Sequence, residues 1–296
     1  MEIEKFTESQ VRSILSHVNR VNHNDANTDI DKERTSLNYS LTPYIGISPE
    51  KYKGNRAARD IVRKAEWDYY RLRKSELYCY NRADVCTLAG CVVSLPQELV
   101  GQPEKAEAFF SAVSRFLCER YGGAPTEDGR IYPNVVSITV HYDERQIGED
   151  AGLRGHMHFE WIPAVAIDKE KLMSKKNHIK MMEFFDYKIS AKEVINKRDL
   201  ETLHSDLAAF LEANGVEGQV VTKHTGEGRT VNIPVSQLKD YTDRTGKTID
   251  RELFKELTVD KLVEALGQSR DHNRDIEWGA RSDWGRADRS EKGWTR

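Results

Sequence analysis

Several features are missing from this sequence of 296 residues, and each absence excludes a class of protein. No apolar run approaches the roughly 18 residues of a membrane-spanning helix, so no membrane span is expected. The first ten residues, MEIEKFTESQ, are polar and acidic and do not form a secretory signal peptide. The four cysteines lack the Cys-x-x-Cys spacing of a zinc site, which predicts reduced thiols in a cytoplasmic protein.

An excess of positive charge is also missing, because the net charge is −3 although 31% of the residues are charged. The total charge therefore does not indicate nucleic-acid binding, but a local basic patch can coexist with a neutral total. There is no internal repeat, and the H-E-x-x-H signature of zinc peptidases is absent. A chain of this length can bury a sizeable core in one or two domains.

The pattern of apolar residues predicts alternating strands and helices. Helices are expected over about 7–21, 56–76, 103–121, 198–213, 235–243 and 258–268, strands over 85–96, 134–142 and 156–164, and a small hairpin around 223–231. Thr7 followed by Gln10 is a capping-box pattern at the start of the first helix. Because the order lacks βαβ regularity, we expect an α+β fold with an antiparallel sheet.

The segment GHMHFEW places two histidines two residues apart. Successive side chains of a strand point to opposite faces, so His156 and His158 share one face with Glu160, and the apolar residues between them face the core. In the preceding strand, His141 belongs to the polar face, and Glu144 lies just past the strand end. If the two strands pair, three imidazoles converge and predict a divalent-metal site. The alternative is a solvated strand face.

The predicted helix near residues 56–74 carries basic and aromatic side chains on one side of a helical wheel. This side contains Arg56, Arg59, Arg63, Trp67, Tyr70 and Lys74. The opposite, apolar stripe contains Ala58, Ile61, Val62, Ala65, Tyr69 and Leu72. Basic residues between aromatic ones suit a surface that follows a nucleic-acid backbone and stacks bases, and Arg82 is a further phosphate-contact candidate. The alternative is a solvated cationic helix with Trp67 packed under a loop.

Three sequence segments resemble known motifs. HMH resembles the His–hydrophobe–His element of the HUH endonucleases, and HYDE followed by HMHFEWIP resembles the metal motif of the MobV (Mob/Pre) relaxases of mobilisable plasmids. HVNR followed by NTDIDKERTSLNYSLT is similar to the first motif of that family, and residues 189–215 resemble its downstream block. The resemblance covers about residues 11–245.

The resemblance implies a fold and a domain layout. The expected fold is an HUH-endonuclease-like antiparallel β-sheet flanked by helices, with the metal site on the sheet face. Residues 1–245 would form the relaxase domain, 246–270 a helical extension and 271–296 a disordered charged tail. Sixteen residues precede His17, which leaves little room for the leading strand of the family.

The resemblance also implies an activity: a DNA nickase that is specific for site and strand, remains covalently attached to the 5′ end and then rejoins it. A divalent metal, Mn²⁺ or Mg²⁺, held by His141, His156 and His158 would polarise the scissile phosphate. The expected partner is a single-stranded or supercoiled transfer origin, with a hairpin from an inverted repeat. A coupling protein of a conjugation system is a further expected partner.

The motif match places His17 where the family keeps its nucleophile, and attack by its imidazole nitrogen would give a phosphoramidate. Glu144 would hold or deprotonate His17. Arg20, three residues on and therefore on the same helix face, would clamp the phosphate. Tyr39 is the alternative nucleophile, because many other HUH relaxases use tyrosine. Arg34 is a further phosphate-contact candidate.

Two other functions are alternatives. A metal-dependent hydrolase of another class would be distinguished by preferring zinc to manganese or magnesium. A non-catalytic DNA-binding or replication-initiator-like module would be expected to have lost a ligand or the nucleophile, yet all of them are present in the sequence.

Overall fold

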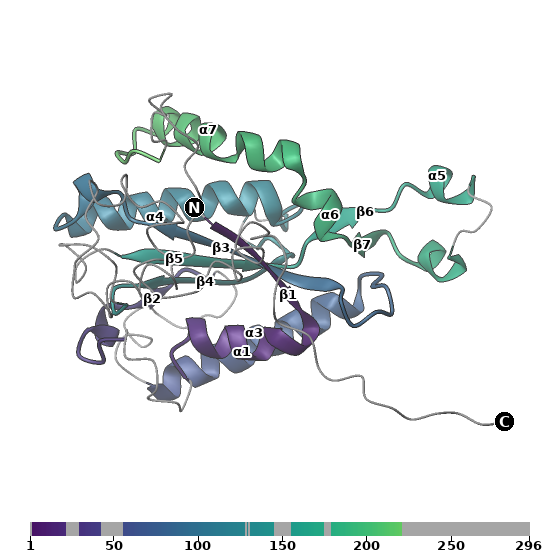
Figure 1. The fold of residues 1–296 in the computed structure, drawn as a ribbon, viewed down its shortest axis with the longest axis horizontal. Helices are drawn as coiled ribbons and strands as arrows, with labels where there is room; N and C mark the ends of the chain where they lie inside the picture. Colours follow the sequence, from purple (N-terminus) through teal and green to yellow (C-terminus); the bar gives the residue numbers. More distant parts are fainter. Residues whose placement is uncertain are drawn as a thin grey trace, which may run out of the picture. The chain divides into compact units, whose positions relative to one another are not determined.

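A five-stranded antiparallel sheet lies at the centre of the fold in the computed structural model (Figure 1). From one edge to the other its strands are β1 (Glu2–Thr7), β3 (Cys86–Ser94), β5 (His156–Trp161), β4 (Val135–His141) and β2 (Tyr39–Ser40). The predicted α+β class with an antiparallel sheet is confirmed. The strands predicted over 85–96, 134–142 and 156–164 are also confirmed, each slightly shorter than expected.

The structure describes residues 2–21, 30–42, 56–127, 129, 131–144, 155–174 and 179–220. These residues belong to one of two compact units of the chain, which comprises Met1–Gln146 and Asp150–Thr225. The hairpin expected around 223–231, the helices expected over 235–243 and 258–268, and the segments 246–270 and 271–296 lie outside the described residues.

The leading strand β1 corrects an expectation from the sequence. Glu2 to Thr7 pair with β3 in antiparallel register, so the residues before His17 do accommodate a strand. Six residues are a usual strand length. The strand was missed because it lies at the sheet edge and carries Glu4 and Lys5, and charged side chains are common on edge strands.

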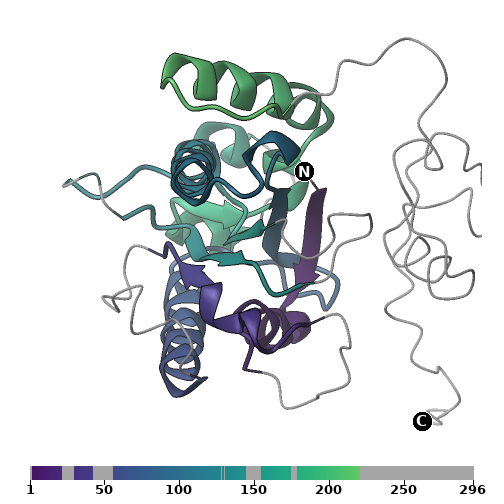
Figure 2. The same cartoon turned by 90° about the vertical axis from the view of Figure 1, so that its left-hand side faces the viewer.

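Helices cover both faces of the sheet. On one face lie α1 (Glu8–Val18) and α3 (Arg56–Ser75). On the other face lies α4 (Pro103–Tyr121), with α7 (Lys197–Ala213) outside it (Figure 1), and the view turned by 90° shows the same layers (Figure 2). The smaller elements are η1 (Arg34–Leu37), η2 (Gln97–Leu99), β6 (Ala164–Ala166), α5 (Lys169–Met173), η3 (Lys180–Phe184), β7 (Tyr187–Ile189) and α6 (Ala191–Val194). Among the helices that the structure describes, none is both long and apolar enough to span a membrane.

Local sequence accounts for the ends of α1 and α4. The backbone N–H of Thr7 donates to Gln10 Oε1 at 2.9 Å, as the capping-box pattern predicts. Pro103 occupies the first turn of α4, and Gly122 follows its last residue. Met157, Phe159 and Trp161 are fully buried against α4, so the apolar face predicted for β5 is the core face.

The buried face of α3 differs from the predicted apolar stripe, and that prediction was wrong. Ile61 and Leu72 are 58% and 62% exposed, and Val62 is the one buried residue of the six in that stripe. The helix instead buries Arg59, Val62, Arg63, Glu66 and Tyr70. A helical wheel assumes that apolar side chains face the core, but this part of the sheet offers polar partners, such as Thr87 to Tyr70.

Candidate metal and nucleophile site

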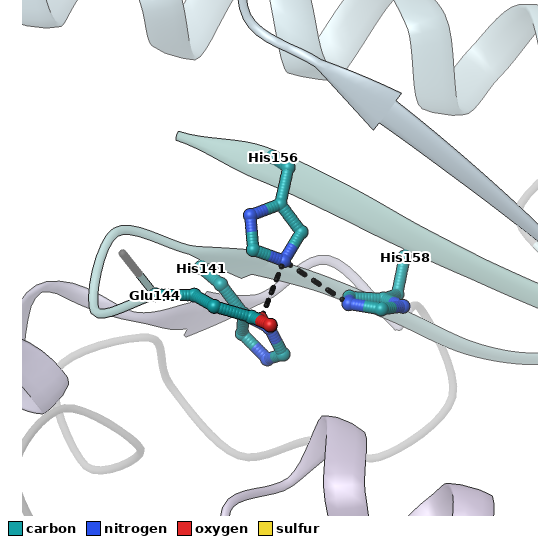
Figure 3. Close-up of side chains that lie close together, drawn as sticks. All are labelled: His141, Glu144, His156 and His158. Atoms are coloured by element: carbon teal, nitrogen blue, oxygen red, sulfur yellow. Dashed lines mark hydrogen bonds and ion pairs between the residues drawn. The ribbon is translucent and has the colours of Figure 1, made fainter. Parts of the chain in front are cut away.

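Three histidines meet on the sheet face that α1 and α3 cover. His141 on β4 pairs directly with His156 on β5. Two residues further along β5, His158 pairs with Thr139 of β4. The ring centroids of His141 and His158 lie 4.8 Å apart, and those of His156 and His158 lie 5.0 Å apart. Ligand atoms of the three imidazoles and of Glu144 all lie within 4.8 Å of one another (Figure 3). This antiparallel register, which the sequence pattern anticipated, brings the three histidines together.

The backbone of α1 sets the orientation of His141. Its Nε2 lies 2.7 Å from the carbonyl oxygen of Val18, which can only accept, so Nε2 carries the proton and donates. The Nδ1 atom is then an unprotonated, buried acceptor, and it has no hydrogen-bond partner among the described residues. Histidines that bind metals are held in this way, with one ring nitrogen fixed by a carbonyl and the other facing the ion.

Two of the three clustered histidines are held in their uncharged form. Burial lowers the pKa of His141 well below its usual value, and the nearby Arg20 charge lowers it further. Burial also lowers the pKa of His158 well below its usual value, with His156 as a second cause. Metal binding requires neutral imidazoles. At neutral pH, His141 and His158 already are neutral, so no added proton has to leave before they bind an ion.

Glu144 lies among the histidines rather than beside His17. Its Oε2 is 3.3 Å from His156 Nε2 and 3.0 Å from Arg20 Nη2. Burial alone would raise the pKa of Glu144, but the hydrogen bond with His156 and the charge of Arg20 hold it well below its usual value. An ionised carboxylate together with three imidazoles is a donor set that suits a divalent metal such as Mn²⁺. Glu144 is therefore placed as a fourth candidate ligand, a role that the sequence did not suggest.

His17 lies next to the cluster at the end of α1. Its ring centroid is 5.9 Å from that of His158, with the two rings nearly perpendicular. Burial lowers the pKa of His17, and the charge of Arg20 acts in the same direction. His17 is thus a neutral, half-buried imidazole that faces the candidate metal ligands.

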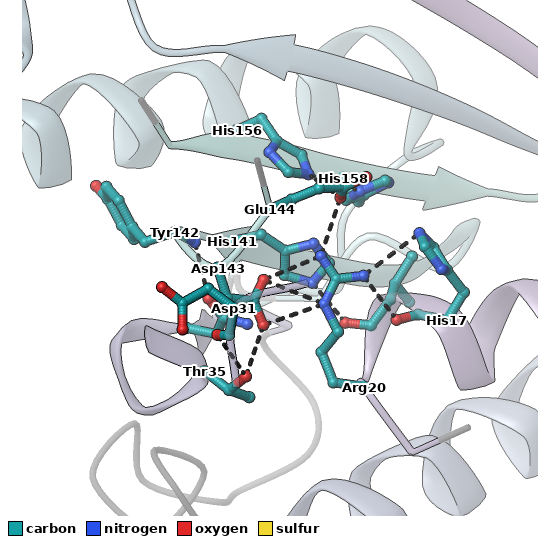
Figure 4. Close-up of polar contacts among 12 residues, drawn as sticks. His17, Arg20, Asp31, Thr35, His141, Tyr142, Asp143, Glu144, His156 and His158 are labelled. Carbon is teal, nitrogen blue, oxygen red and sulfur yellow. Dashed lines mark hydrogen bonds and ion pairs between the residues drawn. The ribbon is translucent and has the colours of Figure 1, made fainter. Parts of the chain in front are cut away.

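Arg20 reaches His17 by a different route from the one expected. It lies beyond the end of α1, with a left-handed backbone at φ +52°, so the two residues do not share a helix face. Its guanidinium nevertheless returns to the helix, and Nη1 lies 3.4 Å from His17 Nε2. Nε and Nη2 both donate to Asp143, at 3.1 and 3.0 Å, and Nη2 also donates to Glu144 (Figure 4). Arg20 therefore joins the nucleophile candidate to the end of the metal-binding strand.

Asp143 and Thr35 belong to the site but were missed in the sequence. Asp143 is buried, and the Thr35 hydroxyl donates to its Oδ2 at 2.9 Å. The Asp31 backbone N–H donates to the Asp143 carbonyl at 2.7 Å, and the Tyr142 N–H donates to Asn38 Oδ1 at 2.8 Å (Figure 4). Asp31, Thr35 and Asn38, all within the first motif, thus hold the turn that follows His141. Asp143 could have been suspected from its place in HYDE, between His141 and Glu144.

Tyr39, the alternative nucleophile, lies on the other face of the sheet. It pairs with Val140, whose side chain belongs to the core beneath α4, and Tyr39 packs against that same core. Burial strongly raises the pKa of its hydroxyl group, and the neighbouring Tyr142 adds to this effect. The sheet separates Tyr39 from the histidine cluster, which argues against its use as the nucleophile.

The residues predicted to line a DNA track do not form one exposed stripe. Tyr70 is fully buried and donates its hydroxyl to Thr87 at 2.8 Å, so it is not available to stack a base. Trp67 stacks on Tyr70 with centroids 5.6 Å apart. Three of the basic candidates are ion-paired, with Arg63 to Asp60, Lys74 to Glu8 and Arg82 to Asp84. Arg56 is exposed and donates to the Val21 carbonyl, and Arg34 is half-buried on η1.

Glu160 shares the histidine face but is not among the four clustered ligand groups. It is nearly fully buried opposite Gly90, and its Oε1 lies 3.8 Å from His158 Nδ1. Burial raises its pKa well above the usual value, and the nearby Glu4 and Glu66 raise it further. Glu160 is thus a neutral carboxyl group behind the candidate ligands.

Comparisons with known proteins agree with this geometry. A family model for the Mob_Pre plasmid recombination enzymes matches residues 1–52. A plasmid recombination enzyme type 3 of Mammaliicoccus lentus is 27% identical over 235 residues, which are 78% of this chain and 44% of that protein. The chain is thus similar in sequence to the Mob/Pre plasmid recombination enzymes. A plasmid recombination enzyme of Lactiplantibacillus plantarum is 23% identical over 237 residues, 78% of this chain and 50% of that protein. The chain thus spans about half the length of these curated relatives.

A solved relaxase has the same fold. The Mn-bound MobM relaxase domain (MOBV; Mob_Pre), in complex with plasmid pMV158 oriT DNA, superposes with a TM-score of 0.50 at 20% identity. The match covers 81% of this chain and 96% of that one. The resemblance to the MobV (Mob/Pre) relaxases and the expected HUH-type fold are confirmed.

Proposed function

We propose that this Mob/Pre relative is a metal-dependent relaxase, which nicks and rejoins one strand of a transfer origin on a plasmid or another mobile element. The observation that carries the proposal is the meeting of a neutral nucleophile candidate, His17, with a compact set of His141, His156, His158 and Glu144. The names of the relatives, plasmid recombination enzymes and an oriT-bound relaxase domain, support this reading.

The metal we assign to this site is Mn²⁺ or Mg²⁺, held by the three histidines together with Glu144. When bound, such an ion withdraws charge from the non-bridging oxygens of the scissile phosphate. The free and buried Nδ1 of His141 fits this role, because a buried acceptor without a partner is costly unless something binds it. Manganese is the ion bound in the solved MobM complex, which supports the same choice here.

His17 is the nucleophile in this proposal. A guanidinium group can only donate, so the contact with Arg20 marks His17 Nε2 as the unprotonated nitrogen. Its lone pair would form the N–P bond while the bond from phosphorus to the DNA 3′-oxygen breaks, and the 3′-oxygen would leave as a hydroxyl group after it is protonated. The imidazole would release its Nδ1 proton, which would be relayed to the departing 3′-oxygen. The product would be a phosphoramidate with a neutral imidazole ring and one negative charge shared by the phosphoryl oxygens. Attack by the 3′-hydroxyl reverses these steps and rejoins the strand.

Arg20 and Asp143 would serve to hold this arrangement. Two N–H groups of Arg20 are engaged by Asp143 and one of them also by Glu144, so the guanidinium is fixed before DNA binds. Its positive charge lies beside His17, where negative charge develops on the phosphate during attack. Arg20 would therefore stabilise the transition state from a fixed position, in place of the two-point phosphate clamp expected from the sequence.

The partners in this proposal are the DNA of the origin and, in transfer, a coupling protein of a conjugation system. The reaction would take place in the cytoplasm, where the four free cysteines would remain reduced. A hydrolase of another class is the weaker reading, because it gives no role to His17 and Arg20. A non-catalytic module is also weaker, because every candidate ligand and the nucleophile candidate are retained.

The chemistry of the covalent product tests the proposal. The full chain is incubated with Mn²⁺ and a supercoiled plasmid that carries the DNA flanking its own gene. A phosphoramidate survives alkali but is lost in mild acid, whereas a phosphotyrosine is more robust to acid. We expect an acid-labile adduct that is absent in His17→Ala and still forms in Tyr39→Phe. An adduct that persists in His17→Ala and disappears in Tyr39→Phe would show that the nucleophile is wrongly assigned. The absence of any adduct and any nick with the wild type would reject the proposed function.

A further inference from the structure

Three residues at the end of α1 and just beyond it each supply one group to the candidate site. They are the side chain of His17, the carbonyl oxygen of Val18 that holds His141, and the guanidinium of Arg20. The helix ends at Val18, and the chain leaves it through the left-handed Arg20. Helix ends fray easily, because their last carbonyl groups lack partners within the helix. A site built on such an end needs something else to fix it in place.

Asn19 supplies that connection, since it lies between Val18 and Arg20 and is completely buried. Its side-chain Nδ2 donates backwards to the Leu15 carbonyl at 2.9 Å and also to Glu66 Oε2 on α3 at 2.6 Å. The first bond lies within α1, whereas the second joins residues 47 positions apart in the chain. The end of α1 is thus tied to a different helix at the residue between its functional groups.

Glu66 is itself held on several sides. It is completely buried, and its Oε1 accepts from the Thr42 hydroxyl at 3.3 Å, just after β2. The Ser137 hydroxyl on β4 is a further hydrogen-bond partner. Glu66 therefore connects α3, the end of α1, the segment after β2, and the strand that carries His141. These are the elements that must keep their relative positions for His17 to face the histidine cluster.

A carboxyl group is a costly choice for this position if packing were its only role. Burying one costs several kcal/mol unless it is well hydrogen-bonded, and apolar or uncharged replacements are often more stable. The buried face of a helix is normally apolar, and residues that depart from this pattern are expected at functional sites. The directional bond to Asn19 offers a functional reason for Glu66, because an apolar side chain cannot make it.

We propose that Glu66 is a positioning residue, which acts through Asn19 to fix the end of α1 and thereby to align His17 and Arg20 with the histidine cluster. This inference rests on the proposed function for its effect on rate, but the contact itself can be tested without DNA. Glu66 touches neither the candidate ligands nor the scissile phosphate in this scheme, so it is not a catalytic residue.

Two substitutions separate the positioning role from bulk packing. Glu66→Leu keeps much of the volume but removes both acceptors for Asn19 and Thr42. Glu66→Gln keeps an acceptor for Asn19, and its amide can donate to the hydroxyl oxygens of Thr42 and Ser137. Two further variants are controls. Asp68→Ala removes an exposed acid from the same helix, and Leu207→Ala destabilises the core at α7, on the other side of the sheet.

The first measurement is the single-turnover nicking rate at saturating Mn²⁺ and saturating plasmid DNA, well below the melting temperature of every variant. A misplacement of about 1 Å can cost about 100-fold in rate, so we expect Glu66→Leu to be roughly 10- to 100-fold slower, with unchanged DNA affinity. Glu66→Gln, Asp68→Ala and Leu207→Ala should stay within about threefold of the wild type. A wild-type rate in Glu66→Leu would overturn the inference, and so would an equal loss of rate in Leu207→Ala.

The second measurement is hydrogen exchange without DNA at the amides of Asn19, Arg20 and Val21. These N–H groups bond to the carbonyls of Leu15, His17 and Ser16 at 3.2, 3.0 and 3.0 Å, so they report on the end of α1. Their exchange should accelerate in Glu66→Leu but not in Glu66→Gln or Leu207→Ala. If the wild type fails to nick DNA, the proposed function is rejected, and hydrogen exchange alone then tests whether Glu66 fixes the end of α1. Unchanged exchange in Glu66→Leu would then overturn the positioning role.

Discussion

Replacing Glu66 by glutamine isolates the cost of keeping a carboxyl group in the interior of this protein. Burial raises the pKa of Glu66 from 4.5 to about 8, although bonds from Ser137, Asn19 and Thr42 partly oppose the shift. Between pH 4.5 and about pH 8, Glu66 keeps its proton in the folded chain and releases it in the unfolded chain. Folding is therefore linked to proton uptake at this residue throughout that range.

The sign and the size of the effect follow from this linkage. The pKa is higher in the folded state, so the stability contributed by the protonated group is complete below pH 4.5 and declines as the pH rises to about 8. The decline is about 1.4 kcal/mol for each pH unit. From about pH 5.5 to about pH 7.5, wild type should therefore lose about 3 kcal/mol through Glu66 alone. Glutamine does not titrate, so Glu66→Gln should escape this loss.

The assay is urea denaturation of wild type and Glu66→Gln at these two pH values, with Asp68→Asn as an exposed control. His141 and His158 titrate in both proteins and cancel in the comparison. Glu66 contributes to the pKa of Glu160, so Glu160→Gln is introduced into both proteins to remove this coupled group. The free energy of unfolding of Glu66→Gln, relative to wild type, should rise by about 3 kcal/mol from the lower to the higher pH. A difference that does not change with pH would show that Glu66 is ionised in the folded protein and would refute the reasoning.

Two further predictions concern the metal and the space behind it. Mn²⁺ at about 100 times its dissociation constant should raise the free energy of unfolding by about 3 kcal/mol. His156→Ala should lose most of this gain in a thermal-shift assay with and without chelator, and an equal shift in the variant would place the ion elsewhere. Gly90→Ala should cost about 1–3 kcal/mol by overpacking, because a Cβ there would lie 2.5 Å from Glu160 Oε2. Adding Glu160→Ala should recover part of the loss in urea denaturation, and purely additive effects would contradict this explanation.

The sequence alone determined the strand that carries the metal ligands and its partner. Strand periodicity is local, so the alternation in HMHFEW was enough to place His156 and His158 on one face and Met157 on the other. The polar face of β4 followed in the same way and included His141, and the structure added the register that sets His141 opposite His156. Local stop signals also placed the ends of α4, through Pro103 and Gly122. The motif match then added His17 and Arg20.

Tertiary structure decided the features that depend on contacts between distant parts of the chain. The buried face of α3 could not be read from a helical wheel, because it is set by polar partners such as Asn19, 47 residues away from Glu66. Tyr39 is an alternative nucleophile by its residue type, but the pairing of β2 with β4 turns it to the opposite face. Arg20 donates to Asp143, which is 123 positions away in the chain, and it does so from a left-handed backbone conformation that no local sequence pattern predicted. Periodicity fixes which side chains share a face, whereas only the packing of whole elements fixes which faces meet.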